Sequence, residues 1–239
     1  GDIVRAGRHL ITLGGDHSLA IGAVAGAAQA VDGTLGLLYI DEHGDMNTHE
    51  STESGNIHGM ALAALIGYGD ERLVKAGGSD TAVNKDNAVH IGGAELDHFE
   101  HEFIENESIE AYQLTDILRH GWQPVFEAVD SLASRADKIW VSIDLDSIND
   151  DAAPGVTMPD KNGLLYREIA MLTRYIGQHC DVVGVSIAEY NHTTDVDYKT
   201  VELGIELAAA VLGGRYDWYS NWMRKQYADM TGGKKLIEI

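Results

Sequence analysis

The chain has 239 residues, 44% of them hydrophobic, so it can bury a substantial core, and its length favours one domain. The 38 acidic and 17 basic residues give a net charge of −21, which disfavours nucleic acid and anionic lipid surfaces as partners. A single cysteine, Cys180, excludes an intrachain disulfide, and the sequence contains neither an apolar secretory leader nor a membrane-spanning run. We therefore expect a cytoplasmic protein.

Short apolar runs alternate along the chain with longer stretches of helix-compatible sequence. The runs that predict buried strands are residues 10–13, 35–40, 88–92, 139–143 and 182–188. The stretches that predict helices are residues 19–31, 59–65, 125–134, 166–176 and 201–212. This alternation predicts an α/β fold with three α/β/α layers around a mainly parallel central sheet.

Potential metal ligands follow three of the predicted strands, at the end of the sheet where ligands bind in such folds. The six residues, in chain order, are His17, Asp41, His43, Asp45, Asp144 and Asp146. If the strand geometry continued, alternate residues would face the same side of the strand, so the side chains of each set, 41, 43 and 45 or 144 and 146, would point the same way. Each motif alone is also typical of a turn or a helix cap. Together, two imidazoles and four carboxylates favour a pair of manganese ions over a structural zinc.

The segments that carry these residues resemble the motifs of the ureohydrolases, the family of arginases and agmatinases. The matching segments are GGDHS at 14–18, DEHGD at 41–45, SIDLD at 142–146 and APG at 153–155, and the similarity covers nearly the whole chain. The resemblance implies an arginase-like fold and a hydrolase that uses two manganese ions to release urea from a guanidinium compound. Nickel or cobalt could occupy similar sites.

The resemblance also implies how the ligands are divided. One manganese would be bound by His17, Asp41, Asp45 and Asp144. The other would be bound by His43, Asp41, Asp144 and Asp146. Asp41 and Asp144 would therefore bridge the two ions, and Asp45 would belong to the catalytic set as well.

Two further residues match the catalytic positions of the family. A guanidinium carbon is a poor electrophile, and two cations about 3.5 to 4 Å apart can share a water and hold the resulting hydroxide for attack. His58 resembles the proton shuttle of the family, although a loop histidine is the alternative interpretation. Glu189 resembles the glutamate that pairs with the substrate guanidinium, because a carboxylate accepts two parallel guanidinium hydrogen bonds.

The segment 47–58 resembles arginases more than agmatinases. By that resemblance the substrate α-carboxylate would be recognised by Asn47, Thr52, Ser54 and Asn56. Asp97 and Glu100 would lie near the α-amino group, directly or through water. We therefore expect hydrolysis of L-arginine to L-ornithine and urea. For the segment 47–58, the alternative is an ordinary polar loop. For the function, the alternatives are an agmatinase, a guanidino-acid hydrolase, a hydrolase of another guanidine compound and a non-catalytic subunit of a mixed oligomer.

Some positions depart from the family pattern. Glu42 replaces the more usual alanine, residues 156–158 replace a smaller Gly-Thr stretch, and His192 replaces a common proline. Family members also carry another strand before the GGDHS segment, so we treat residues 1–239 as one ureohydrolase domain that lacks it. We expect a homo-oligomer, a trimer or hexamer, to which the aromatic-rich segment 216–227 could contribute, unless it is an ordinary packed end.

Overall fold

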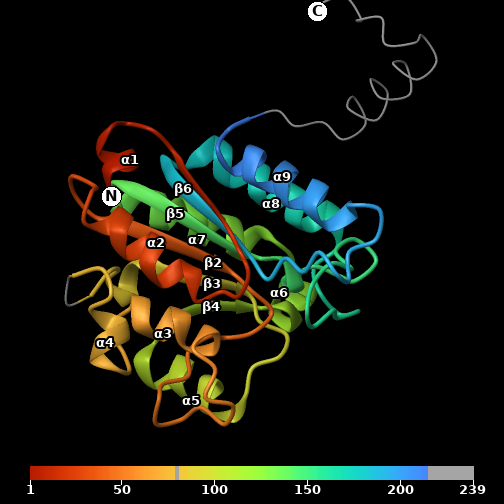
Figure 1. The fold of residues 1–239 in the computed structure, drawn as a ribbon, viewed down its shortest axis with the longest axis horizontal. Helices are drawn as coiled ribbons and strands as arrows, with labels where there is room; N and C mark the ends of the chain where they lie inside the picture. The colour runs from red at the N-terminus through yellow and green to blue at the C-terminus, as the bar shows by residue number, and fades with distance from the viewer. Residues whose placement is uncertain (79–80, 215–239) are drawn as a thin grey trace, which may run out of the picture.

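The computed structural model describes residues 1–78 and 81–214, whose strands form one six-stranded sheet in the order β1-β6-β5-β2-β3-β4 (Figure 1). Every pairing among these strands is parallel. The strands are β1 (Leu10–Leu13), β2 (Leu35–Ile40), β3 (Ala88–Gly92), β4 (Glu110–Gln113), β5 (Lys138–Asp144) and β6 (Val182–Ala188).

Helices connect the strands along the chain and cover both faces of the sheet. The α-helices are α1 (Asp2–Arg5), α2 (Leu19–Ala28), α3 (Ala61–Leu65), α4 (Glu71–Val74), α5 (His98–Glu107), α6 (Leu114–His120), α7 (Gln123–Arg135), α8 (Tyr166–His179) and α9 (Lys199–Val211). Three short 3-10 turns are η1 (His58–Met60), η2 (Lys85–Asn87) and η3 (Leu145–Ser147). None of the helices within residues 1–78 and 81–214 is long and apolar enough to cross a membrane.

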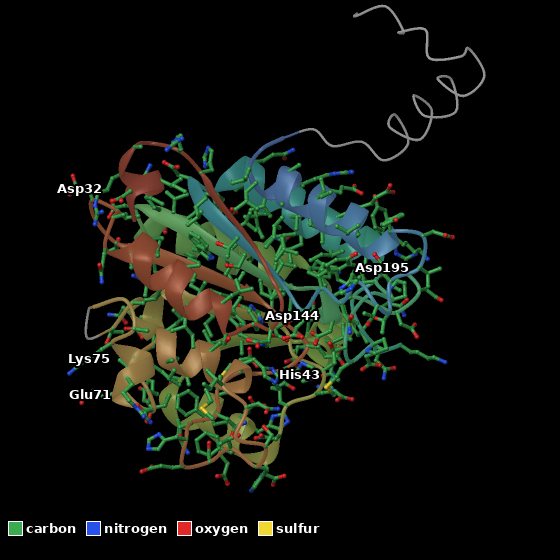
Figure 2. The ribbon with its side chains drawn as sticks, viewed as in Figure 1. Asp32, His43, Glu71, Lys75, Asp144 and Asp195 are labelled. Carbon is green, nitrogen blue, oxygen red and sulfur yellow. The ribbon has the colours of Figure 1, made fainter. Side chains whose placement is uncertain are left out.

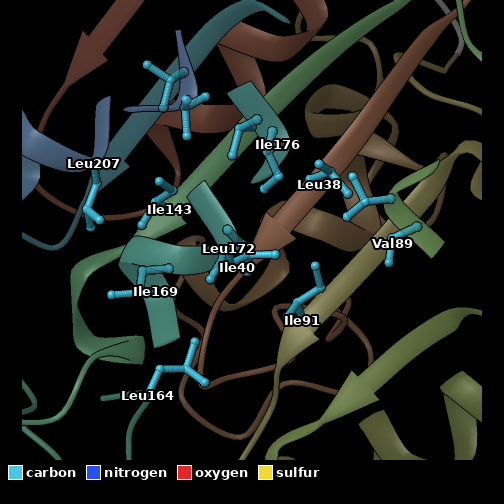
Figure 3. Close-up of a cluster of buried hydrophobic side chains, with 14 of the residues drawn as sticks. Leu38, Ile40, Val89, Ile91, Ile143, Leu164, Ile169, Leu172, Ile176 and Leu207 are labelled. Atoms are coloured by element: carbon cyan, nitrogen blue, oxygen red, sulfur yellow. The ribbon is translucent and has the colours of Figure 1, made fainter. Parts of the chain in front are cut away.

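The alternation of side chains along the central strands divides the core into two layers. On one face, Leu38 and Ile40 of β2 pack with residues of α7, α8 and α9 (Figure 3). On the other face, Leu37 and Tyr39 of the same strand pack with residues of α2 and α3. Because both faces are covered, all six residues of β2 are buried, as a central parallel strand requires. The three-layer α/β/α prediction is confirmed.

All five predicted strands are present, but the expectation of burial is wrong for β1. This strand is at one edge of the sheet and pairs only with β6 among the described strands. Its alternate residues Ile11 and Leu13 are 47% and 67% exposed. The short apolar run was consistent with a buried strand, but an edge position leaves one side of it uncovered.

The five predicted helices are also present, with ends shifted by a few residues. Strand β4 and helices α1, α4, α5 and α6 were not predicted. β4, with the sequence EAYQ, is half-buried at the other edge of the sheet and has no apolar run. α5 is predominantly polar, and Glu100 and Phe103 are its only buried residues. The aromatic-rich segment 216–227 lies outside the described residues.

Candidate metal centre and active site

The polar residues that follow the strands meet at the carboxyl edge of the sheet. His17 lies in the loop after β1, Asp41 directly follows β2, Asp144 ends β5 and Glu189 directly follows β6. These strands are neighbours in the order β1-β6-β5-β2, so parallel alignment carries all four residues to one region. Figure 2 labels Asp144 and His43 in the middle of the molecule, at this edge.

One group of possible metal ligands surrounds the imidazole of His17. Its Nδ1 lies 2.9 Å from Asp41 Oδ2, 3.0 Å from Asp144 Oδ2 and 3.5 Å from Asp45 Oδ2. His17, Asp41, Asp45 and Asp144 are all buried. Three carboxylates therefore converge on one ring nitrogen inside the protein.

A second group shares Asp41 with the first. The Nδ1 atom of His43 lies 3.6 Å from Asp41 Oδ1 and 3.6 Å from Asp146 Oδ2. Ligand atoms of His17, Asp41 and Asp45 lie within 4.8 Å of one another, and so do those of Asp41, His43 and Asp146. The structure thus brings all six predicted ligands together in two groups with a common carboxylate.

Local turns, and not continued strands, place these side chains. The main chain bends after Asp41, whose Oδ1 accepts a hydrogen bond from the His43 N–H at 2.9 Å. Asp45 has a left-handed backbone, with φ of 51°. Asp146 lies in η3, and its N–H donates to Asp144 Oδ1 at 2.9 Å. The expectation of strand-like alternation is wrong, because aspartate side chains bond the main chain two residues later and form turns.

Two residues inside the strands orient the ligands, and sequence reasoning missed both. Nε2 of His17 lies 2.7 Å from Ser142 Oγ, so an N–H at Nε2 would leave Nδ1 free to bind a metal. The hydroxyl of Tyr39 donates to Asp45 Oδ2 at 2.6 Å. A polar side chain within each apolar run, Ser142 and Tyr39, was the available signal.

The electrostatics of the groups fit bound cations. Burial, followed by the charges of Asp144 and Asp41, raises the pKa of Asp146 to about 12. Burial and the charge of Asp41 also raise the pKa of Asp45 well above its usual range. Such pKa values mean that the ionised carboxylates are unfavourable together unless positive charge is supplied.

The same crowding of carboxylates raises the pKa values of the two histidines, so it favours their charged forms. A hydrogen bond to Asp41 is the largest cause that raises the pKa of His43 to about 10. Burial would raise the pKa of Asp41, but the hydrogen bonds from His17 and His43 lower it below its usual range. Asp146 Oδ1 is buried and lacks a hydrogen-bond partner among the described residues. An orphaned oxygen and excess negative charge suit metal ions, whose binding would release the imidazole protons.

Glu189 lies beside this centre in a strained conformation. Its φ is 59°, in the left-handed region, and its N–H donates to Gly15 O at 2.8 Å. Its Oε1 accepts from the His17 N–H at 3.0 Å. Burial, followed by the charge of Asp144, raises the pKa of Glu189, whereas a charge on His58 lowers it. His58, half-buried at the start of η1, is thus near enough to Glu189 for their charges to interact.

The predicted carboxylate-binding residues lie in the irregular loop between Asp45 and η1. Thr52 Oγ1 accepts from the Gly55 N–H at 3.0 Å, and Ser54 Oγ accepts from the Asn56 N–H at 3.2 Å. Ser54 and Asn56 are exposed, and Thr52 is half-buried. The loop therefore presents hydroxyl and amide groups to solvent while its own side chains fix its turns.

Asp97 and Glu100 form the N-terminal cap of α5. Asp97 Oδ1 accepts from the Glu100 N–H at 2.9 Å, and Glu100 Oε2 accepts from the Asp97 N–H at 3.1 Å. The other oxygen of Glu100 accepts from the Met46 N–H at 3.1 Å. Asn47 Nδ2 donates to Asp97 Oδ2 at 2.7 Å, which joins this cap to the predicted carboxylate-binding loop. The buried Glu100 thus has a structural role, and contact with an α-amino group stays a prediction.

Comparison with known proteins agrees with this geometry. The Arginase family model matches residues 1–213. Arginases of Brevibacillus brevis and Bacillus caldovelox are 37% and 36% identical, over 90% and 88% of this chain and 72% and 71% of their own lengths. The crystal structure of arginase from Bacillus cereus is 38% identical, with a TM-score of 0.85 over 90% of this chain and 75% of that one. The chain therefore belongs to the arginase family, whose members are metal-dependent hydrolases that act on C–N bonds of guanidino compounds.

Proposed function

We propose that the chain is an arginase that hydrolyses L-arginine to L-ornithine and urea with two bound manganese ions. The observation that carries this proposal is the pair of buried ligand groups joined by Asp41, with Glu189 beside them. Family membership supplies the reaction class, and the similarity to named arginases favours arginine as the substrate. The predominance of carboxylate ligands favours manganese.

We assign His17, Asp45 and Asp144 with Asp41 to one ion, and His43 and Asp146 with the same two bridging aspartates to the other. When bound, the two cations would lower the pKa of a shared water and so supply a nucleophile at neutral pH. The protein's part is to fix the ligands. Ser142 is hydrogen-bonded to His17, and Tyr39 is hydrogen-bonded to Asp45, so the side chains of both ligands are limited in their rotation.

Glu189 would bind the guanidinium group of the substrate. Its main chain is held by Gly15 O, and its position directly after β6 directs the carboxylate towards the His17 side of the centre. Two parallel hydrogen bonds from the guanidinium would orient its central carbon towards the metal groups. The positive substrate would also offset the burial that raises the pKa of Glu189.

His58 would deliver a proton to the departing amine. An amine leaves readily only when it is protonated, and histidine changes its charge in the physiological pH range. The half-buried ring can reach both solvent and the site, and its charge acts on Glu189. In this proposal the residue would have access to a proton source and would lie beside the substrate.

The other end of the substrate would contact the loop 47–58 and the start of α5. Thr52, Ser54 and Asn56 offer neutral donors that suit a carboxylate, and Asp97 suits an ammonium group. Agmatine has no α-carboxylate, so it would leave the neutral donors unpaired. This difference favours L-arginine over agmatine.

Urea release by the purified full chain tests the proposed function. We expect urea from L-arginine after manganese loading, and none above background after dialysis against a chelator. Agmatine and guanidinobutyrate, each with manganese or nickel, separate the alternative substrates and metals. Absence of urea with every substrate and metal would favour the non-catalytic subunit instead.

We also propose that the protein is cytoplasmic and forms a homo-oligomer, a trimer or hexamer. The exposed Ile11 and Leu13 on the edge strand β1 support association, because an open apolar edge is a common contact surface. Light scattering of the purified chain measures the assembly. A monomer at micromolar concentration would contradict the proposal.

A further inference from the structure

A third group of acidic side chains lies next to the two groups around Asp41. Carboxylate oxygens of Glu42, Glu95 and Asp160 lie within 4.8 Å of one another. Glu42 follows β2, Glu95 follows β3, and Asp160 lies in the loop between η3 and α8, after β5. Because β5, β2 and β3 are consecutive neighbours in the parallel sheet, their carboxyl ends bring these three loops together.

Glu42 is unusual for a carboxylate because its side chain is buried. It is 2% exposed, and its Oε2 atom has no hydrogen-bond donor among the residues that the structure describes, although its side chain meets the Asp160 carboxylate. Asp160 Oδ2 is likewise buried without a donor within residues 1–78 and 81–214, whereas its Oδ1 accepts from the Asn162 N–H at 2.8 Å. Two neighbouring carboxylates whose buried oxygens lack a donor require either a shared proton or a cation.

The main chain holds these carboxylates in place. The carbonyl of Glu42 accepts hydrogen bonds from the N–H groups of Ala94 and Glu95, at 2.9 and 3.1 Å. The carbonyl of Asp160 accepts from the Asp150 N–H at 2.8 Å. The exposed Glu95 gives the group an opening to solvent. The group is thus fixed by backbone bonds and accessible from outside.

We propose that Glu42, Glu95 and Asp160 bind one calcium ion at a site separate from the binuclear centre. The ligands are all oxygens, which suits a hard divalent cation, whereas both groups around Asp41 contain an imidazole. Calcium binds oxygens at about 2.3 to 2.6 Å, so one ion can hold oxygens that are up to about 5 Å apart, and the oxygens of this group all lie within 4.8 Å of one another. Magnesium demands near-ideal octahedral geometry and retains several waters, so a group of three carboxylates on separate loops suits calcium better. The ion would join the loops that follow β2, β3 and β5.

Equilibrium dialysis against calcium, with both metals measured by elemental analysis, tests this site on the manganese-loaded full chain. We expect one calcium per chain without loss of manganese. Asp160→Asn, which is remote in sequence from the other ligands, and Glu42→Gln should each weaken calcium binding at least about tenfold, because each removes a charged ligand. Glu105→Gln, an exposed change on α5, is the matched control and should bind calcium normally.

The calcium measurement does not depend on the proposed arginase activity. Asp144→Asn, which we expect to impair the binuclear centre, should still bind calcium, so failure of one centre can be told from failure of the other. No calcium uptake at about 10 mM, well above the range of weak protein sites, would overturn the proposal and favour a shared proton. Uptake that displaces manganese, or that persists unchanged in both Asp160→Asn and Glu42→Gln, would overturn it as well.

Discussion

The phenol ring of Tyr39 stacks on the imidazole of His17, with ring centroids 4.4 Å apart and planes at 13°. The same side chain donates its hydroxyl proton to Asp45 Oδ2 at 2.6 Å. One residue of the central strand β2 thus positions two proposed ligands of one metal ion. The buried ring fixes the plane of His17 by packing, and the hydroxyl fixes one oxygen of Asp45.

Tyr39→Phe should therefore weaken metal binding while the fold is preserved. The phenylalanine keeps the stacking but leaves Asp45 Oδ2 without its donor, and loss of such supporting bonds typically costs about 10- to 100-fold in metal affinity. Manganese retention during dialysis against a graded chelator measures the change. Tyr112→Phe on the edge strand β4 removes a 3.3 Å hydroxyl bond to Glu110 and is the matched control. Equal retention in wild type and Tyr39→Phe would refute the positioning role.

Asp144→Asn should abolish urea release and lower the manganese content. Asp144 is proposed to bridge both ions, and a neutral amide is a poorer ligand than a carboxylate. Elemental analysis and a urea assay on the same preparation measure both effects. Asp32→Asn, the same change at an exposed position, should behave as wild type. A variant at position 144 with two ions per chain and normal turnover would exclude the proposed bridge.

His58→Ala should lower turnover by roughly 10- to 10,000-fold and leave the metal content unchanged. The reason is that a proton shuttle serves the leaving amine without binding a metal. Steady-state assays with and without added imidazole measure the loss and any chemical rescue. His120→Ala at the exposed end of α6 provides the control. An unchanged rate would leave His58 with only a structural role.

Trp140→Ala should lower the free energy of unfolding by roughly 3 to 5 kcal/mol, as expected for a large side chain lost from a core. Trp140 is fully buried in β5, and its Nε1 donates to Ser186 Oγ at 3.1 Å. Chemical denaturation measures the difference. Leu118→Ala, at a side chain that is 72% exposed on α6, should change the free energy by less than about 0.5 kcal/mol. A similar loss in both variants would show that the burial of Trp140 has been misjudged.

The metal ligands could be predicted from the sequence because three of them come at the ends of predicted parallel strands. Buried parallel strands are visible as apolar runs, and the residue after such a run must lie at the carboxyl edge. His17, Asp41 and Asp144 each follow or end such a run and are therefore predicted to lie together. The turns that direct Asp45 and Asp146 were not predicted, since a left-handed aspartate and a 3-10 turn leave little trace in the sequence.

Contacts between segments that are far apart in the chain could not be predicted from the sequence either. Glu42 was recognised only as a departure from the family pattern, because its neighbour Asp160 lies in a loop far along the chain. Strand β4 was missed because its half-buried edge position tolerates the polar sequence EAYQ. Glu100 was matched to a substrate position, whereas its bonds to Asp97 and Met46 depend on a helix that the polar residues did not reveal.

The ratio of kcat/KM for L-arginine to that for agmatine, measured as urea release by the manganese-loaded chain, tests the proposed arginase function most directly. We expect a ratio of at least about one hundred, because agmatine would leave several donors of the loop 47–58 unpaired. An equal or reversed preference would contradict the arginase assignment and leave a hydrolase of another guanidino compound.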